Sequence, residues 1–262
     1  MRMKKRHIYW TVALIVIAII IVLLSIGYRI DGWKIIKAGN ITVTVPHSGS
    51  VVYLNNKEYK TTKADNQIVK FRSLPEKEHS IIVAKEGNWP WAKKAVARPN
   101  ETRSFVVWNL EQTSTMEIIQ KGTPEYAENS ALISSYKLPT IEAPMYSTDQ
   151  KMSLYVNNST VYITWYGDVD SVPELFCEKN RACKRTVPLI SLVKKVSGIF
   201  FYPNTNDRLI ISSEGSVSAL EIAETGNQNY QYITLGSNPS SYVIGDTLYI
   251  KDGEAMGKVT LK

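Results

Sequence analysis

A long uncharged apolar stretch near the amino terminus constrains this chain more than any other feature of its sequence. Residues 8–28 carry no charge, and thirteen of these 21 residues are Ile, Leu or Val. As an α-helix rising about 1.5 Å per residue, this stretch is long enough to cross the roughly 30 Å hydrocarbon core of a bilayer. Lipid offers no hydrogen-bond partners, so an isolated span must pair its backbone groups within a helix. The sequence therefore predicts a transmembrane helix over residues 8–28.

The charges on either side of this stretch predict its orientation. Four basic residues lie within residues 1–7, whereas Arg29, Asp31 and Lys34 behind the stretch nearly cancel. Because basic flanks stay in the cytoplasm, residues 1–7 are expected to form a cytoplasmic tail. A cleaved signal peptide would need a shorter apolar core and a small-residue cleavage site, and neither is present. We expect a single-pass cell-membrane protein whose amino terminus is cytoplasmic and whose remaining chain is extracytoplasmic.

Composition and charge narrow the classes of partner. Hydrophobic residues make up 44% and charged residues 21% of the 262 residues, which is typical of globular domains rather than of disordered chains. The formal net charge is +7, and four of the positive charges lie within residues 1–7. The rest of the chain is expected to be near neutral, whereas a nucleic-acid binder gathers Lys and Arg on one face. We therefore expect no nucleic-acid partner.

The two cysteines, Cys177 and Cys183, fit the extracytoplasmic compartment. They would lie on the oxidising side of the membrane, where disulfides form and persist. A zinc site would need two more ligands, and the external chain offers only His47 and His79, which are far away in the sequence. We therefore predict a disulfide between the two cysteines, and neither a metal nor a cofactor.

The region from residue 39 to residue 110 shows the alternation and the turns of short strands. At residues 41–45 every second residue is apolar, so one face of this strand is expected to be buried. Asn55 and Asn56 form a tight turn, because Asn tolerates a positive φ. Further strands are predicted at residues 51–54, 68–71, 80–84, 94–97 and 103–110. Their spacing predicts a small antiparallel β-sandwich over residues 39–110.

Four short motifs in this region resemble those of the PEGA domain, a small bacterial extracytoplasmic β-sandwich named for a Pro-Glu-Gly-Ala turn. The turn is Pro-His-Ser-Gly-Ser at residues 46–50, and the hairpin tip that follows is Asn-Asn at residues 55–56. The family's Leu-x-x-Gly-x-His step is Leu-Pro-Glu-Lys-Glu-His at residues 74–79, and its Gly-Tyr end is Gly-Asn-Trp at residues 87–89. The resemblance implies a binding or spacing module at the cell surface, with envelope polysaccharide as a contact and without catalytic residues.

The sandwich region contains few candidate binding residues. Trp89 and Trp91 are candidate ligand-stacking residues, because flat aromatic faces stack on sugar rings or lie at membrane interfaces. The alternative is that both tryptophans cap the core of the sandwich. His47 and His79 are expected in a turn and at the start of a strand, since neither has a carboxylate or Ser partner at a spacing typical of catalysis.

The carboxy-terminal half repeats a short pattern of strands. Periodicity fades over residues 111–151, where Pro, Ser, Thr and Glu predict a linker. Within residues 152–262, three passes repeat strand, polar turn, strand, Gly turn and strand, as propeller blades do. Residues 202–209 are similar to the strand-turn-strand step of WD-like propeller repeats in bacterial periplasmic proteins. Four blades need roughly 160 residues, so we predict an incomplete propeller-like stack of antiparallel sheets, either open or joined by strands of the linker.

Few residues in the sequence are typical of catalysis. Residues 191–194 match the Ser-x-x-Lys motif of penicillin-binding enzymes, but its Ser-Asp-Asn and Lys-Thr-Gly partners are absent from the sequence. Asp168, Asp170 and Glu174 could supply oxygen ligands to Ca²⁺, although the glycine and the spacing of a calcium loop are missing.

The whole chain resembles single-pass bacterial membrane proteins that carry a PEGA domain and a WD-like blade tail. The expected fold is mainly β, with a transmembrane helix, a PEGA-like sandwich and blade-like sheets. The expected function is a non-enzymatic binding or scaffold protein of the cell envelope, with envelope polysaccharide or a protein as its partner. The alternative is an envelope enzyme or its regulatory subunit, such as a peptidoglycan hydrolase or transferase.

Overall fold

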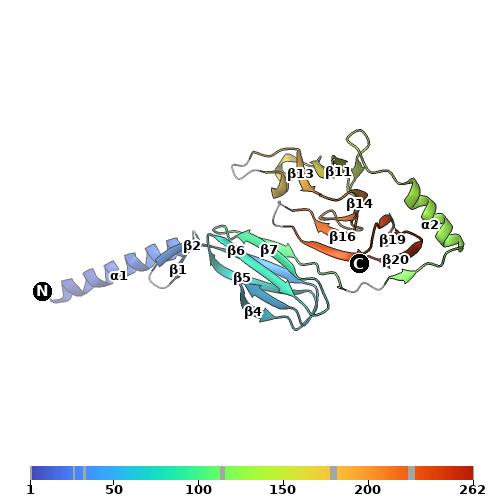
Figure 1. Cartoon of the computed structure of the whole chain (residues 1–262). Helices are drawn as coiled ribbons and strands as arrows, with labels where there is room; N and C mark the ends of the chain where they lie inside the picture. The colour runs from blue at the N-terminus through green and yellow to red at the C-terminus, as the bar shows by residue number, and fades with distance from the viewer. Residues whose placement is uncertain are drawn as a thin grey trace. The chain divides into compact units, whose positions relative to one another are not determined.

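The computed structural model describes most of the chain, whose course is drawn in Figure 1. The described residues are 2–25, 27–31, 34–112, 116–177, 182–223 and 228–261. They consist mainly of strands, β1 to β20, together with the helices α1 and α2. The chain divides into two compact units, the first formed by residues 1–86 and 90–108 and the second by residues 87–89 and 109–262. The predicted mainly β fold class is confirmed.

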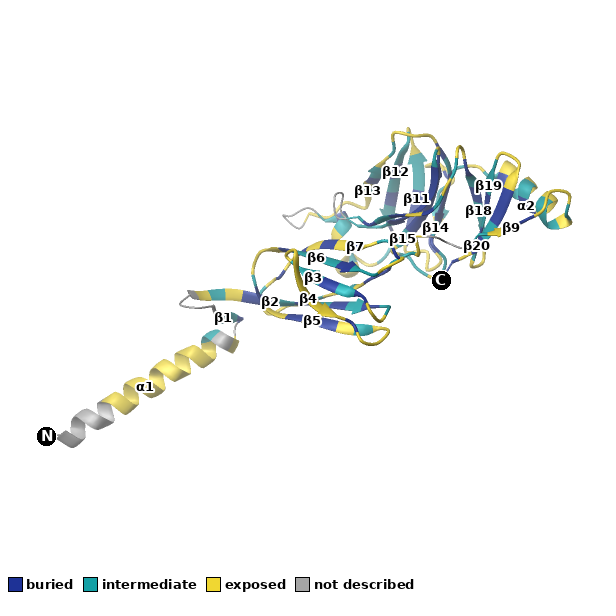
Figure 2. Cartoon of the chain, turned by 60° about the horizontal axis from the view of Figure 1, so that its bottom comes forward, coloured by how far each residue is buried: buried dark blue, intermediate teal, exposed yellow. Residues whose placement is uncertain are grey.

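The helix α1 (Arg2–Ser25) begins the first unit. Its side chains from residue 9 to residue 22 are exposed, as the colouring of Figure 2 shows. Among the described residues, no helix has both the length and the apolarity needed to cross a membrane. Residue 26 of the predicted span at residues 8–28, and the side chains of the predicted tail at residues 1–7, lie outside the described part of the structure.

Two four-stranded sheets build the rest of the first unit. The first sheet contains β1 (Tyr28–Asp31), β2 (Lys34–Val45), β5 (Gln67–Pro75) and β8 (Thr102–Val106). The second contains β4 (Lys57–Thr61), β3 (Val51–Leu54), β6 (Glu78–Ala84) and β7 (Trp91–Val96), in that order. The strands pair antiparallel except that β8 runs parallel to β2. The prediction of a purely antiparallel arrangement was wrong for this pair, because the chain crosses from β7 in the second sheet before it returns to β2.

The two sheets bury apolar side chains between them. Alternation along β2 places Ile41, Val43 and Val45 at 0% exposure, as the sequence predicts. The ring of Trp91 in β7 lies 6.2 Å from the ring of Phe105 in β8, measured between centroids, so side chains of both sheets meet in this core. Burial of each such side chain contributes about 1.5–3 kcal/mol of stability.

The second unit contains three four-stranded antiparallel sheets. The first contains β10 (Met145–Tyr146), β11 (Met152–Asn157), β12 (Thr160–Trp165) and β13 (Thr186–Ser191). The second contains β14 (Val196–Phe201), β15 (Arg208–Ser213), β16 (Ser216–Glu221) and β17 (Tyr230–Leu235). The third contains β18 (Ser240–Ile244), β19 (Thr247–Asp252), β20 (Ala255–Thr260) and β9 (Glu117–Ile118).

The sheet of β14 to β17 lies between the other two sheets of this unit. One face shares a core with the β10 to β13 sheet, where Leu209 and Ile211 cluster with Leu154 and Ile163. The other face approaches the β18 to β20 sheet. Because both faces are covered, all but the first residue of β15 and all but the last of β16 are buried. Strands covered on both faces lack a strict alternation of apolar and polar residues.

The segment predicted as a linker, residues 111–151, contains regular structure of the second unit. The strand β9 pairs with β20, and thus joins an early segment of this unit to its last strand. The helix α2 (Pro124–Ser135) begins where the Thr123 hydroxyl accepts a hydrogen bond from the backbone N–H of Tyr126, as N-cap residues do. Its Ile133 is buried in a small cluster with Met256. Strands of the predicted linker therefore join the sheets.

Candidate functional site

The structure separates the two candidate ligand-stacking tryptophans. Trp91 has 0% of its surface exposed, so no face of its ring is open to a ligand. Trp89 is half-buried and belongs to the second unit. Its Nε1 donates a hydrogen bond to the Tyr232 carbonyl oxygen at 3.0 Å, and the two rings meet edge-on with centroids 5.6 Å apart. Trp91 therefore has the core role that was the alternative interpretation, whereas ligand stacking by Trp89 stays a prediction.

The predicted disulfide between Cys177 and Cys183 is confirmed. The two cysteines also face each other in an isolated antiparallel bridge, so the bond closes a short excursion of the chain. Residues 178–181 within this excursion lie outside the described residues. Beside it, the buried ring of Phe176 packs with its centroid 6.1 Å from that of Trp165. The disulfide therefore lies directly next to a core residue.

Several residues considered for catalysis or metal binding make contacts within the fold. The Ser191 hydroxyl is 2.9 Å from the Thr160 hydroxyl across two paired strands. The buried His79 ring lies between the Asn55 side-chain nitrogen, at 3.1 Å, and the Pro75 carbonyl oxygen, at 3.0 Å. The backbone oxygen of Asp168 accepts a hydrogen bond from Trp165 Nε1 at 3.3 Å. Within the described residues, no group of three or more His, Cys, Asp or Glu side chains gathers in a way that would hold a metal ion.

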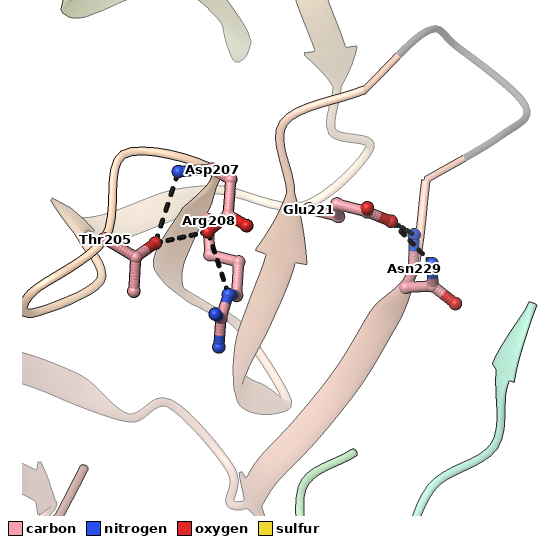
Figure 3. Close-up of polar contacts among 5 residues, drawn as sticks. All are labelled: Thr205, Asp207, Arg208, Glu221 and Asn229. Atoms are coloured by element: carbon pink, nitrogen blue, oxygen red, sulfur yellow. Dashed lines mark hydrogen bonds and ion pairs between the residues drawn. The ribbon is translucent and has the colours of Figure 1, made fainter. Parts of the chain in front are cut away.

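A polar cluster at the edge of the β14 to β17 sheet also has a structural role (Figure 3). The Asp207 carboxylate accepts hydrogen bonds from the Thr205 hydroxyl and from Arg208 Nε, the latter at 3.0 Å. The Arg208 guanidinium lies over the Tyr202 ring, 5.2 Å from its centroid. These contacts hold the turn between β14 and β15, which the sequence predicts as a polar turn.

A small pocket lies between the second and third sheets of the second unit. Its lining includes Met116, Leu235 and Met256, and its volume is about 60 Å³. Sites for small ligands usually measure about 300–1,000 Å³. This pocket is therefore too small for such a ligand. Exposed surfaces of the described residues offer further candidate sites.

One such surface is a group of five cations on the first unit, which we name the basic face. It consists of Lys57, Lys60, Lys63, Lys70 and Arg72, all of them exposed. They lie on β4, on β5 and in the turn between them. The two strands belong to different sheets but meet at one edge of the unit, where the Tyr59 hydroxyl donates a hydrogen bond to the Lys70 carbonyl oxygen at 3.1 Å.

The basic face has little compensating negative charge. Among the described residues, no carboxylate lies within ion-pairing distance of its five cations. Glu58 lies between two of them on β4. Asp65 accepts a hydrogen bond from the Ser48 backbone N–H at 2.7 Å, which holds the pKa of this carboxyl below its ordinary value. The Asp65 charge is therefore engaged by the neighbouring turn rather than by the basic face.

The near-neutral charge expected outside the amino-terminal tail, 7 − 4 = +3, is unevenly distributed along the chain. Residues 34–108 contain thirteen Lys and Arg against six Asp and Glu, a net charge of +7. Residues 109–262 contain thirteen against seventeen, a net charge of −4. The near-neutral sum therefore hides two regions of opposite sign. A count of charges within each region, rather than over the whole chain, would have shown from the sequence that residues 34–108 are basic, but not which of these cations lie together.

A second surface is the solvent-facing side of the β10 to β13 sheet, which we name the tyrosine face. Tyr155 and Tyr162 are opposite each other on β11 and β12, with parallel rings whose centroids are 5.0 Å apart. Tyr146 and Tyr166 form a second ring pair, at 5.8 Å. The Tyr146 pKa is raised, because Tyr166 disfavours a second negative charge beside it. Sequence reasoning missed this face, although the predicted hairpin already paired its strands.

Comparisons with known proteins do not identify the chain. No protein-family model matches it. No curated protein matches it either. The resemblance to the PEGA domain and to propeller blades therefore stays a prediction from short motifs.

Proposed function

We propose that this chain is a membrane-anchored, extracytoplasmic, non-enzymatic binding or scaffold protein of the cell envelope. In this proposal α1 belongs to the anchor, the amino terminus is cytoplasmic, and both β units lie outside the membrane. The units are proposed to contact envelope polysaccharide or a protein partner. The first unit is proposed to be a PEGA-like sandwich, and the second a propeller-like stack of sheets.

The observation that carries the proposal is the exposed apolar surface of α1. Leu14, Ile15 and Ile21 are 64%, 54% and 59% exposed, and the side chains between residues 9 and 22 contain no charged group. Such a contiguous apolar surface is unfavourable in water and marks a site that contacts lipid or another protein. A helix that is apolar on all sides is typical of a membrane segment.

Two further observations support the compartment and the binding role. The Cys177–Cys183 disulfide is typical of extracytoplasmic proteins, because the cytosol keeps thiols reduced. The tyrosine face combines aromatic rings with Ser and Thr hydroxyls. The Thr164 and Thr186 hydroxyls on this side of the sheet are 3.0 Å apart. Surfaces rich in Tyr and small polar residues make good contact surfaces, because Tyr supplies a large area at a low cost in side-chain entropy.

Membrane extraction combined with protease treatment tests the proposal. We expect the full chain, expressed in bacterial cells, to stay with the membranes after washing at high pH. Protease added outside the cytoplasmic membrane is expected to degrade both β units and to spare the amino terminus. Ile17→Lys with Ile20→Lys should release the chain into the soluble fraction, because each charge at the centre of a span costs roughly 2.5–3.5 kcal/mol on the insertion scale.

The control for this experiment is Ile35→Lys, which changes a 59% exposed isoleucine in β2 outside the helix. This variant should remain with the membranes. Release of the unaltered chain by the high-pH wash, or degradation of its β units only after the cytoplasm is opened, would contradict the proposal.

A further inference from the structure

We propose that the basic face of the first unit binds the anionic phosphate headgroups of the membrane surface. This role rests on the proposed function in one respect, because the proposed membrane anchor brings the basic face close to a bilayer. The residues with this lipid-binding role are Lys57, Lys60, Lys63, Lys70 and Arg72.

The charge on this face matches an anionic surface. Its five cations are exposed and, among the described residues, without ion pairs, so their fields reach outward. On β5, Lys70 and Arg72 alternate with the buried Val69 and Phe71, which places both cations on the outer side of the sheet. Lys and Arg near an anionic membrane each add to attraction that falls off within a Debye length.

Exposed apolar side chains within the same face favour lipid over a soluble polyanion. Ile68 is 54% exposed and shares the outer side of β5 with Lys70. Tyr59 on β4 is 50% exposed, while its ring packs against the buried Phe71, 4.6 Å between centroids, and its hydroxyl donates to the Lys70 carbonyl oxygen. Tyrosine is enriched at membrane–water interfaces, where its ring lies at the level of the headgroups. A soluble polyanion would offer no apolar layer for the isoleucine, whereas the boundary between headgroups and acyl chains does.

The connection to α1 keeps the face near a bilayer that holds this helix. The helix ends at Ser25, and β2 begins at Lys34. Two residues after the helix, the Gly27 carbonyl oxygen accepts a hydrogen bond from the Ala38 N–H of β2 at 2.8 Å. The neighbouring Gly39 pairs with Leu74 of β5, so the tether to the face is short. A tether of this length gives the face a high effective concentration at the membrane, so weak individual contacts are enough to hold it there.

Lysine labelling in lipid nanodiscs tests the inference on the full chain. The chain is reconstituted into discs of phosphatidylcholine alone or of phosphatidylcholine with phosphatidylglycerol, and an amine-reactive reagent reports the accessibility of each lysine by mass spectrometry. We expect Lys60 and Lys63 to react at least about fivefold more slowly in the anionic discs. Lys137 and Lys151, exposed in the second unit, serve as internal controls and should react equally in both. High salt should remove the difference.

Variants assign this protection to charge and to apolar contact. Lys57→Glu with Lys70→Glu leaves the two reporter lysines in place and should abolish their protection, whereas Lys57→Arg with Lys70→Arg should keep it. Ile68→Ser should reduce the protection without abolishing it. The matched control Lys151→Glu with Lys195→Glu changes the net charge equally on the second unit and should leave the protection unchanged. Far-ultraviolet circular dichroism verifies that each variant is folded.

Three outcomes would overturn the inference. These are equal labelling of Lys60 and Lys63 in both kinds of disc, loss of protection in the control variant, and equal protection by soluble polyphosphate in neutral discs. If the chain does not enter discs at all, the proposed anchor fails, and the free chain is sedimented with vesicles of the same two compositions. Binding to anionic vesicles alone, lost in the Lys57→Glu, Lys70→Glu variant, would then still support the lipid-binding face, and absence of binding would overturn it.

Discussion

The two units of this protein bury their sheets in different ways. In the first unit each sheet covers one face and leaves the other to solvent, so β7 alternates strictly between buried and exposed residues. In the second unit the β14 to β17 sheet is covered on both faces, and β16 is buried almost throughout. The alternation of a strand thus reports how many of its faces are covered, and not only whether it is a strand.

The two units also differ in the side chains that lie between their own sheets. In the first unit large side chains such as Phe71 and Trp91 fill the core. In the second, the small residues Gly198, Ser212 and Ser241 lie in the contact between the β14 to β17 and β18 to β20 sheets, beside one ring pair of Phe200 and Tyr242. The buried hydroxyls of Ser212 and Ser241 are 2.5 Å apart. Small residues allow a close approach of two sheets, and their buried hydroxyls then need each other as partners.

The largest effect on stability is expected at Gly39, where two backbone segments of the first unit lie very close together. A Cβ on Gly39 would lie 2.0 Å from the Arg98 carbonyl oxygen, which is backbone and cannot rotate away. We expect Gly39→Ala to lower the free energy of unfolding by about 3 kcal/mol. Hydrogen exchange followed by mass spectrometry should show faster exchange in β2 and β5, with the second unit unchanged.

The control for this prediction is Gly49→Ala in the same unit. Gly49 has φ +74°, and nothing lies within 4 Å of its Cβ position, so only backbone strain of about 1–2 kcal/mol is expected. Equal destabilisation by the two variants would show that the contact at Gly39 relaxes freely.

An intermediate effect is expected in the second unit when its disulfide is removed. The bond closes a short loop, with a separation of six residues between Cys177 and Cys183. On the chain-entropy model, Cys177→Ser with Cys183→Ser should lower the free energy of unfolding by about 2 kcal/mol. Thermal unfolding of the variant should match that of the unaltered chain in a reducing agent. An unchanged melting temperature in both cases would mean that the loop contributes nothing to the unit.

The smallest effect concerns a single hydrogen bond between the former linker segment and β14. The Tyr136 hydroxyl donates to the Ile199 carbonyl oxygen at 2.6 Å, and burial raises the pKa of Tyr136 to about 12. We expect Tyr136→Phe to lower the free energy of unfolding by about 1 kcal/mol at pH 7, as measured by urea unfolding.

The same tyrosine predicts a dependence on alkaline pH. The pKa in the folded chain exceeds the ordinary value of 10.0, so the folded state binds this proton more tightly than the unfolded state. Its stabilisation is fully present below pH 10 and is lost between about pH 10 and pH 12. As the pH rises through this interval, the difference in the free energy of unfolding between Tyr136→Phe and the unaltered chain should therefore decrease. The control is Tyr249→Phe, because the Tyr249 hydroxyl has no hydrogen bond among the described residues. The free energy of unfolding of this variant should follow that of the unaltered chain at every pH.

Local sequence signals predicted several elements well because their causes are local. The Asn-Asn turn has φ values of 52° and 63°, which Asn adopts more readily than other side chains. The hairpin of β11 and β12 lies where alternation and a polar turn place it. The disulfide follows from two cysteines close enough in the chain to meet without help from the rest of the fold.

Elements that depend on distant partners were missed. The helix α2 and the strand β9 lie in the segment interpreted as a linker, and β9 has only two residues, too few to show a period. The basic face was missed because its cations come from two strands of different sheets. The Trp89 and Trp91 pair was treated as one feature, whereas the fold places only Trp91 in the core.

The sequence by itself determined that the chain is mainly β, where its tight turns fall and which two cysteines pair, because each of these depends on neighbours along the chain. Only the tertiary structure decided that β8 runs parallel to β2, that β9 completes the last sheet and that five cations gather at one edge of the first unit. These features depend on which strands meet after the chain has folded back on itself. The alternation of apolar and polar residues along a strand does not indicate which other strand will pair with it.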